Sequence, residues 1–134
     1  MSIYTNKLKE QHVQIKNLLT DVQKYIATDE TKKQFVAKLS KLLKNHIETE
    51  DKELYVVLKK TSEKSPAVQR KLNLFAKGWE EISEFAEEYI KKYSSGNFDG
   101  KFLHDTGKIL AKLKTRMLKE EVGLFSEYDK IVLQ

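Results

Sequence analysis

The chain has 134 residues, of which 40% are hydrophobic and 34% charged, a composition typical of one soluble globular domain with a real core. It contains no cysteine, which excludes disulfide bonds, zinc–thiolate sites, iron–sulfur clusters and cysteine nucleophiles. The formal net charge is +5, yet the lysines are scattered among acidic residues without an arginine-rich run, a pattern that indicates a solvated surface and argues against a nucleic-acid partner.

The first half of the chain carries two helical patterns. Apolar residues recur at three- and four-residue spacing over residues 3–27, which predicts a first helix, and ATDE breaks this pattern. The same spacing over residues 31–60 predicts a second helix, which ends at TSEKSP.

The second half repeats this arrangement. Ser65 is suited to cap a helix that has Pro66 in its first turn, so a third helix is expected over residues 66–93. After the loop YSSGNFDG a fourth helix is expected over residues 101–121, and a short helical tail is indicated by Leu124, Phe125 and Ile131. Four amphipathic helices with short connections predict an all-α, antiparallel, up-down-up-down four-helix bundle that forms a single domain over residues 1–134.

The amino-terminal stretch MSIYTNKLKEQ lacks the apolar core of a signal peptide, and no apolar run approaches membrane-spanning length. We therefore expect a cytoplasmic protein without a membrane partner.

The apolar face of each predicted helix is interrupted by polar or large aromatic residues: His12 in the first, His46 and Glu50 in the second, Trp79 in the third, and Arg116 with Glu120 in the fourth. Residues four apart lie on one helix face, so His46 and Glu50 can point at the same place. The two halves are also related, because His46–Glu50–Leu54 matches Arg116–Glu120–Leu124 at an offset of 70 residues. The polar groups are therefore expected to meet in one buried layer.

Two buried carboxylates need a compensating cation, which leaves a metal ion, Arg116, a protonated histidine or a combination of these as alternatives. A single histidine on an apolar face is more often a hydrogen-bonded core residue than a ligand. The joint pattern of two histidines with carboxylates one turn further along two helices favours a metal site more strongly than any one residue does.

The segments LKEQHVQIKNLL, LLKNHIETEDKELY and LKTRMLKEEVGLF resemble the hemerythrin-like, or HHE cation-binding, domain family over nearly the whole chain. The resemblance implies a bundle that holds two irons bridged by two carboxylates. His12 and His46 match the histidines of the iron that keeps an open position. Glu50, with either Glu120 or Glu121, matches the bridging carboxylates.

The second half departs from the family pattern. The histidines of the other iron are replaced by Phe75, Trp79 and Arg116, none of which can act as an imidazole ligand. The resemblance therefore implies one metal per chain, held by His12, His46, Glu50 and Glu120, with iron preferred and manganese or zinc as alternatives. Three further residues are expected either to take the place of the missing metal or to contact the ligands from outside: Arg116, Trp79 and Glu121.

These residues lead to two functional hypotheses. In the first, a single iron senses or binds a small ligand such as oxygen or nitric oxide. In the second, the bundle is metal-free and serves as a protein-interaction or regulatory module, with Arg116 bridging Glu50 and Glu120. Enzymatic turnover at an open single-metal site is left as an alternative, although the sequence supplies no distinct acid–base or nucleophile group beyond the metal ligands. In both, Trp79 is predicted to be buried beside His46 and Glu50.

Overall fold

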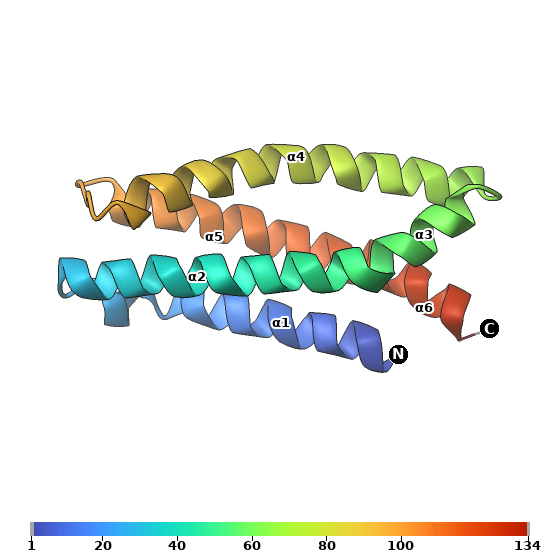
Figure 1. Cartoon of the computed structure of the whole chain (residues 1–134), viewed down its shortest axis with the longest axis horizontal. Coiled ribbons are helices and arrows are strands. Elements are labelled where there is room, and N and C mark those ends of the chain that lie inside the picture. Colours follow the sequence, from blue (N-terminus) through green and yellow to red (C-terminus); the bar gives the residue numbers. More distant parts are fainter. Residues whose placement is uncertain (1, 134) are drawn as a thin grey trace.

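The structure is a computed structural model that describes residues 2–133. Four antiparallel helical arms form the molecule (Figure 1). The first arm is α1 (Ile3–Thr20), followed by a 3₁₀ turn (Val22–Tyr25). The second is α2 (Asp29–Thr49), which continues through a π-helical turn (Glu50–Leu54) into α3 (Tyr55–Ser62). The third is α4 (Pro66–Ser94), and the fourth is α5 (Phe102–Lys119), which continues through a second π-helical turn (Glu120–Phe125) into α6 (Ser126–Val132).

The predicted all-α bundle is confirmed. The first arm packs against α2 and α5, and α4 packs against the same two helices from the other side, so the four arms close around one axis. Within residues 2–133 there is no strand. The expected short helical tail is α6, which extends the fourth arm through the second π-helical turn without a break in the helix.

Helix starts follow the local capping chemistry. Ser65 accepts a hydrogen bond from the Val68 amide and Pro66 occupies the first turn, as the sequence predicts. The second arm begins with a reciprocal capping box between Thr28 and Thr31. The first helix ends at Thr20, earlier than expected, and the 3₁₀ turn takes the chain toward α2.

The core consists of two apolar clusters with a polar layer between them. The larger cluster occupies the part of the bundle near the α1–α2 and α4–α5 connections and includes Ile15, Leu19, Phe35, Leu39, Tyr93, Phe102, Ile109 and Leu113. The smaller cluster gathers where α3 and α6 lie, and consists of Leu8, Leu54, Leu58, Leu124, Phe125 and Tyr128. The polar layer consists of the buried side chains of His12, His46, Glu50, Arg116 and Glu120.

The two π-helical turns explain the spacing of the buried residues. Four consecutive buried positions in the second arm are four residues apart: His46, Glu50, Leu54 and Leu58. In a regular α-helix each four-residue step rotates the side chain by about 40°, so the last of four would point well away from the first. A wider turn with five-residue hydrogen bonding reverses part of this drift. The fourth arm repeats the device at Arg116, Glu120, Leu124 and Tyr128.

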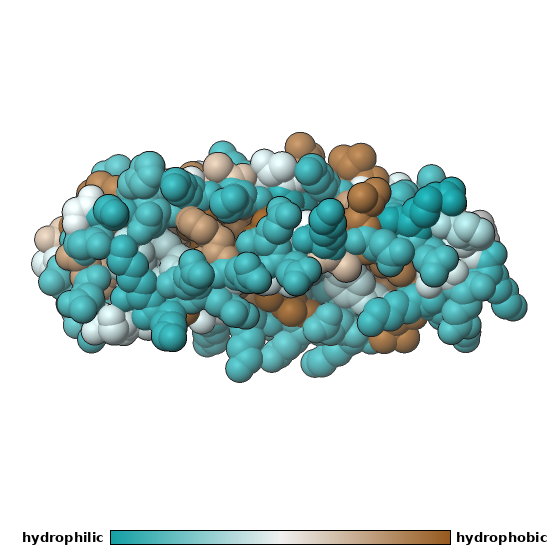
Figure 2. Space-filling view, turned by 90° about the horizontal axis from the view of Figure 1, so that it is seen from above, coloured by the Kyte–Doolittle hydropathy of each residue, from teal (hydrophilic) through white to brown (hydrophobic). Residues whose placement is uncertain are grey.

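The outer surface is mainly hydrophilic. The face seen in Figure 2, on which α4 lies, carries small, separated groups of apolar side chains. On α4, Leu74 is 72% exposed. Within residues 2–133, no helix combines the length and the apolar character that crossing a bilayer requires.

The predicted burial of Trp79 is wrong in degree. Its side chain is only half-buried, and it lines an open groove between α2 and α4 together with Leu43 and Ile47. Phe75 is also half-buried. On α1, His12 is fully buried and the neighbouring Val13 is 48% exposed.

Candidate metal centre

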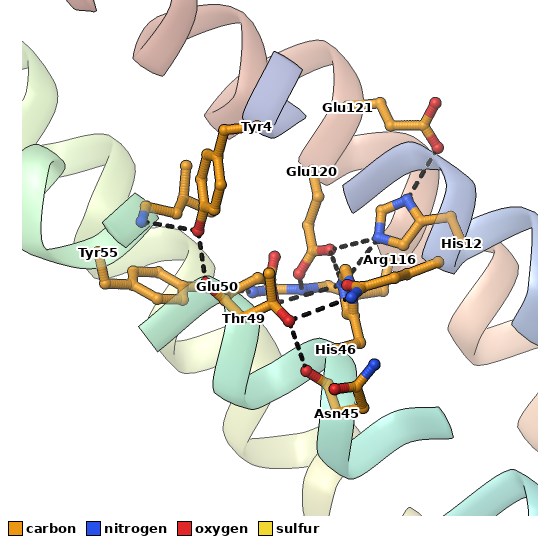
Figure 3. A network of polar contacts seen from close by, with 12 residues as sticks. Tyr4, His12, Asn45, His46, Thr49, Glu50, Tyr55, Arg116, Glu120 and Glu121 are labelled. Carbon is orange, nitrogen blue, oxygen red and sulfur yellow. Dashed lines mark hydrogen bonds and ion pairs between the residues drawn. The ribbon is translucent and has the colours of Figure 1, made fainter. Parts of the chain in front are cut away.

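Three hydrogen-bond-accepting side chains converge in the polar layer (Figure 3). The Nε2 atoms of His12 and His46 lie 3.0 Å apart, and the Glu120 Oε1 atom lies 3.0 Å from the first and 3.5 Å from the second. They come from α1, α2 and the start of the second π-helical turn, and all three are buried. This group can hold a metal ion, because each residue offers one ligand atom and these atoms lie within 4.8 Å of one another.

Outer contacts orient both imidazoles. The His46 Nδ1 atom lies 2.8 Å from Gln11 Oε1, while the Gln11 amide nitrogen donates to the Thr49 hydroxyl. The His12 Nδ1 atom lies 3.0 Å from Glu121 Oε2. Because both partners are acceptors, each Nδ1 carries a proton and each Nε2 directs a lone pair or a second proton into the layer. Metal-binding histidines commonly have such an acceptor on the second nitrogen.

Glu50 lies beside this group. Its Oε1 atom is 3.4 Å from His46 Nε2, and its buried Oε2 atom has no hydrogen-bond partner among residues 2–133. Burial, followed by the charge of Glu120, raises the pKa of Glu50 well above its ordinary value. A buried carboxylate oxygen without a partner fits a site that is completed either by a cation or by a proton.

Glu120 has the opposite electrostatic balance. Burial favours its neutral form, but the hydrogen bonds with His12 and His46 and the charge of Arg116 outweigh burial and lower its pKa below the ordinary range. Burial lowers the pKa of His46. In the metal-free protein, Glu120 is therefore the ionised carboxylate of the layer, and Glu50 holds a proton at neutral pH.

The structure corrects the expectation that Arg116 bridges Glu50 and Glu120. Its Nε donates to Glu120 Oε2 at 3.0 Å, its Nη1 donates to the Phe75 carbonyl at 2.7 Å and its Nη2 donates to the Tyr55 hydroxyl at 3.4 Å. Neither a hydrogen bond nor an ion pair joins it to Glu50, so within the described chain it neutralises one carboxylate and does not bridge two. The reason is its packing: the guanidinium lies over the rings of Phe75 and Trp79 and is drawn toward α4.

A family model named hemerythrin HHE cation binding domain matches residues 4–128. The chain belongs to the hemerythrin HHE family. Neither the curated proteins nor the solved structures gave a match. Within this hemerythrin HHE domain, the guanidinium of Arg116 and the rings of Phe75 and Trp79 stand together on the α4–α5 side of the polar layer, where the sequence resemblance implied a second set of histidines.

The structure brings together most of the residues expected in the hemerythrin HHE site. His12, His46 and Glu120 form one group, Glu50 touches it through His46, and Glu121 contacts its outer edge through His12. Sequence reasoning missed Gln11, which orients His46. The sequence offered little indication of this role. Gln11 is polar, and periodicity places it at the edge of the buried face, where a polar side chain is not unusual.

The contribution of Glu50 to the stability of the metal-free protein is expected to fall as the pH rises from 4.5 to about 10. Because Glu50 binds its proton more tightly in the folded state, the free energy of unfolding decreases as the pH rises above the ordinary value of 4.5, by up to about 1.4 kcal/mol per pH unit. The pKa values of Glu120 and His46 are lowered, so their contributions to the free energy of unfolding are instead lost as the pH falls. Urea unfolding of chelator-treated protein between about pH 6 and about pH 9 measures the slope.

Glu50→Gln should remove the alkaline loss, because the amide imitates the protonated carboxyl group. Glu48→Gln, at an exposed position of the same helix, is the matched control and should keep the wild-type slope. An unchanged slope in Glu50→Gln would show that Glu50 is ionised throughout.

Proposed function

We propose that this hemerythrin HHE domain binds one divalent metal ion per chain through His12, His46 and Glu120, with Glu50 as the fourth ligand. The observation that carries the proposal is the convergence of the two Nε2 atoms and a carboxylate oxygen, while each Nδ1 is held by an acceptor outside the group. Two imidazoles with carboxylates suit Fe(II), Mn(II) and Zn(II), and iron is our first candidate.

The chain's own residues prepare this site. Gln11 and Glu121 hold the imidazole rings in place, and the surrounding apolar clusters keep the ligand atoms out of bulk water. The unpartnered Glu50 Oε2 atom is available for a cation without first breaking a hydrogen bond. Iron bound here would supply a coordination position for a small ligand such as oxygen or nitric oxide.

A second metal is not proposed. Arg116 already places a permanent positive charge on Glu120 Oε2, and the rings of Phe75 and Trp79 flank its guanidinium. The same ion pair supports the alternative function, a metal-free bundle that acts through a protein partner, because it neutralises Glu120 while Glu50 carries a proton.

Metal titration separates the two functions. Chelator-stripped protein should take up one Fe(II), Mn(II) or Zn(II) per chain, with the melting temperature rising as metal is added. Two ions per chain would contradict the single-site proposal. Absence of saturable binding of any of the three, together with a melting temperature that does not respond to chelator, would favour the metal-free module.

A further inference from the structure

A side chain of the first arm, Tyr4, reaches into the π-helical turn of the second arm. The Leu54 amide donates to the Tyr4 hydroxyl at 2.9 Å, and this hydroxyl donates to the Thr49 carbonyl at 2.6 Å. These two backbone groups are five residues apart, which is the pairing of a π-helical turn. The Tyr4 oxygen therefore lies inside the backbone ladder and relays a bond that the backbone would otherwise make directly (Figure 3).

The turn that Tyr4 bridges contains Glu50. Glu50 directly follows the Thr49 carbonyl, and its own carbonyl accepts from the Tyr55 amide, again five residues away. A side chain that inserts into the hydrogen-bond ladder of a helix is a recognised cause of local distortion. The widened turn offsets the drift of about 40° that each four-residue step adds in a regular helix, and so keeps Leu54 and Leu58 on the buried face that His46 and Glu50 occupy.

The second π-helical turn lacks this feature. By the 70-residue offset, the groups equivalent to the Thr49 carbonyl and the Leu54 amide belong to Lys119 and Leu124, and no side-chain hydroxyl within residues 2–133 bonds to either of them. The carboxylate of that turn, Glu120, is instead held by Arg116 and by both histidines. Glu50 has fewer partners in the described part of the chain, where its Oε2 atom makes no hydrogen bond.

We propose that Tyr4 is a positioning residue: its hydroxyl holds the turn around Glu50 open and so sets the Glu50 carboxylate at the edge of the group formed by His12, His46 and Glu120. The effect on the backbone is independent of metal. The effect on metal affinity rests on the proposed function.

The backbone effect is tested in the metal-free protein with Tyr4→Phe. The phenyl ring keeps the contact with the Tyr128 ring, at 5.1 Å between centroids, and only the hydroxyl is lost. We expect the Leu54 amide to exchange its hydrogen faster by on the order of tenfold, and the Glu50 carboxyl carbon to shift its NMR resonance. Tyr89→Phe, which removes a buried hydroxyl bonded to Thr106 in the larger cluster, should leave both signals unchanged. Wild-type exchange at Leu54 and an unmoved Glu50 resonance in Tyr4→Phe would overturn the proposal.

The metal effect is tested by titrating Zn(II) into the same variants. Tyr4→Phe should weaken binding roughly 10–100-fold, as loss of an outer contact does, while Tyr89→Phe should not. In a Glu50→Ala background, Tyr4→Phe should cause no further loss, because its influence runs through the Glu50 carboxylate. An equal loss in both backgrounds would show that Tyr4 acts on the fold in general and not on Glu50. If wild-type protein binds no metal, the proposed function fails, and the exchange and carboxyl measurements still decide the role of Tyr4.

Discussion

Replacing His12 with alanine is expected to abolish the stabilisation that metal confers on this hemerythrin HHE domain. His12 is fully buried, and its Nε2 atom is 3.0 Å from both other ligand atoms of the group. At a free metal concentration about 1,000-fold above the dissociation constant, binding adds about 4 kcal/mol to the free energy of unfolding. For a domain of this size that corresponds to a rise of roughly 10–20 °C in the melting temperature.

The measurement is the difference in melting temperature with and without metal, because His12→Ala also leaves a cavity that lowers the stability of the metal-free protein. His104→Ala is the matched control, since His104 is exposed and far along α5 from the polar layer. It should keep the full metal-induced rise. A rise of wild-type size in His12→Ala would exclude this histidine as a ligand.

Replacing Arg116 with methionine is expected to be among the most destabilising single changes in the metal-free protein. Methionine fills part of the volume but leaves the buried Glu120 carboxylate without its permanent countercharge. Removing one partner of a buried ion pair lowers the free energy of unfolding by about 3–5 kcal/mol. Part of the loss should be regained as the pH falls and Glu120 takes up a proton. Urea unfolding of chelator-treated protein measures the effect.

A double-mutant cycle isolates the pair. If the Arg116–Glu120 contact carries the cost, Arg116→Met combined with Glu120→Gln should be far more stable than the sum of the two single effects predicts. Additive effects would mean that Arg116 stabilises the bundle through Phe75 and Trp79 alone. Arg116→Met should also enlarge the metal-induced rise in melting temperature, because the guanidinium and a metal ion compete for the charge of Glu120.

Much of the architecture could be predicted from residue periodicity. The three- and four-residue spacing of apolar side chains predicts four amphipathic arms, and the short connections require neighbouring arms to run antiparallel. The same spacing places His46 and Glu50 on one face, and the 70-residue repeat places Glu120 in the corresponding position of the other half. The π-helical turns were visible in principle, because His46, Glu50, Leu54 and Leu58 continue a strict four-residue interval that a regular α-helix cannot keep on one face.

Only the tertiary structure decided what each polar group contacts. Periodicity defines the face on which Arg116 lies, but the choice of Glu120 over Glu50 follows from the rings of Phe75 and Trp79, which draw the guanidinium toward α4. Trp79 is half-buried because the open groove between α2 and α4 leaves part of its ring uncovered. The roles of Gln11 and Tyr4 depend on contacts between helices, because a hydrogen bond requires both a suitable angle and a distance that is correct to a few tenths of an ångström. A sequence determines which side of a helix is buried; the packing of one helix against the next determines which atoms meet there.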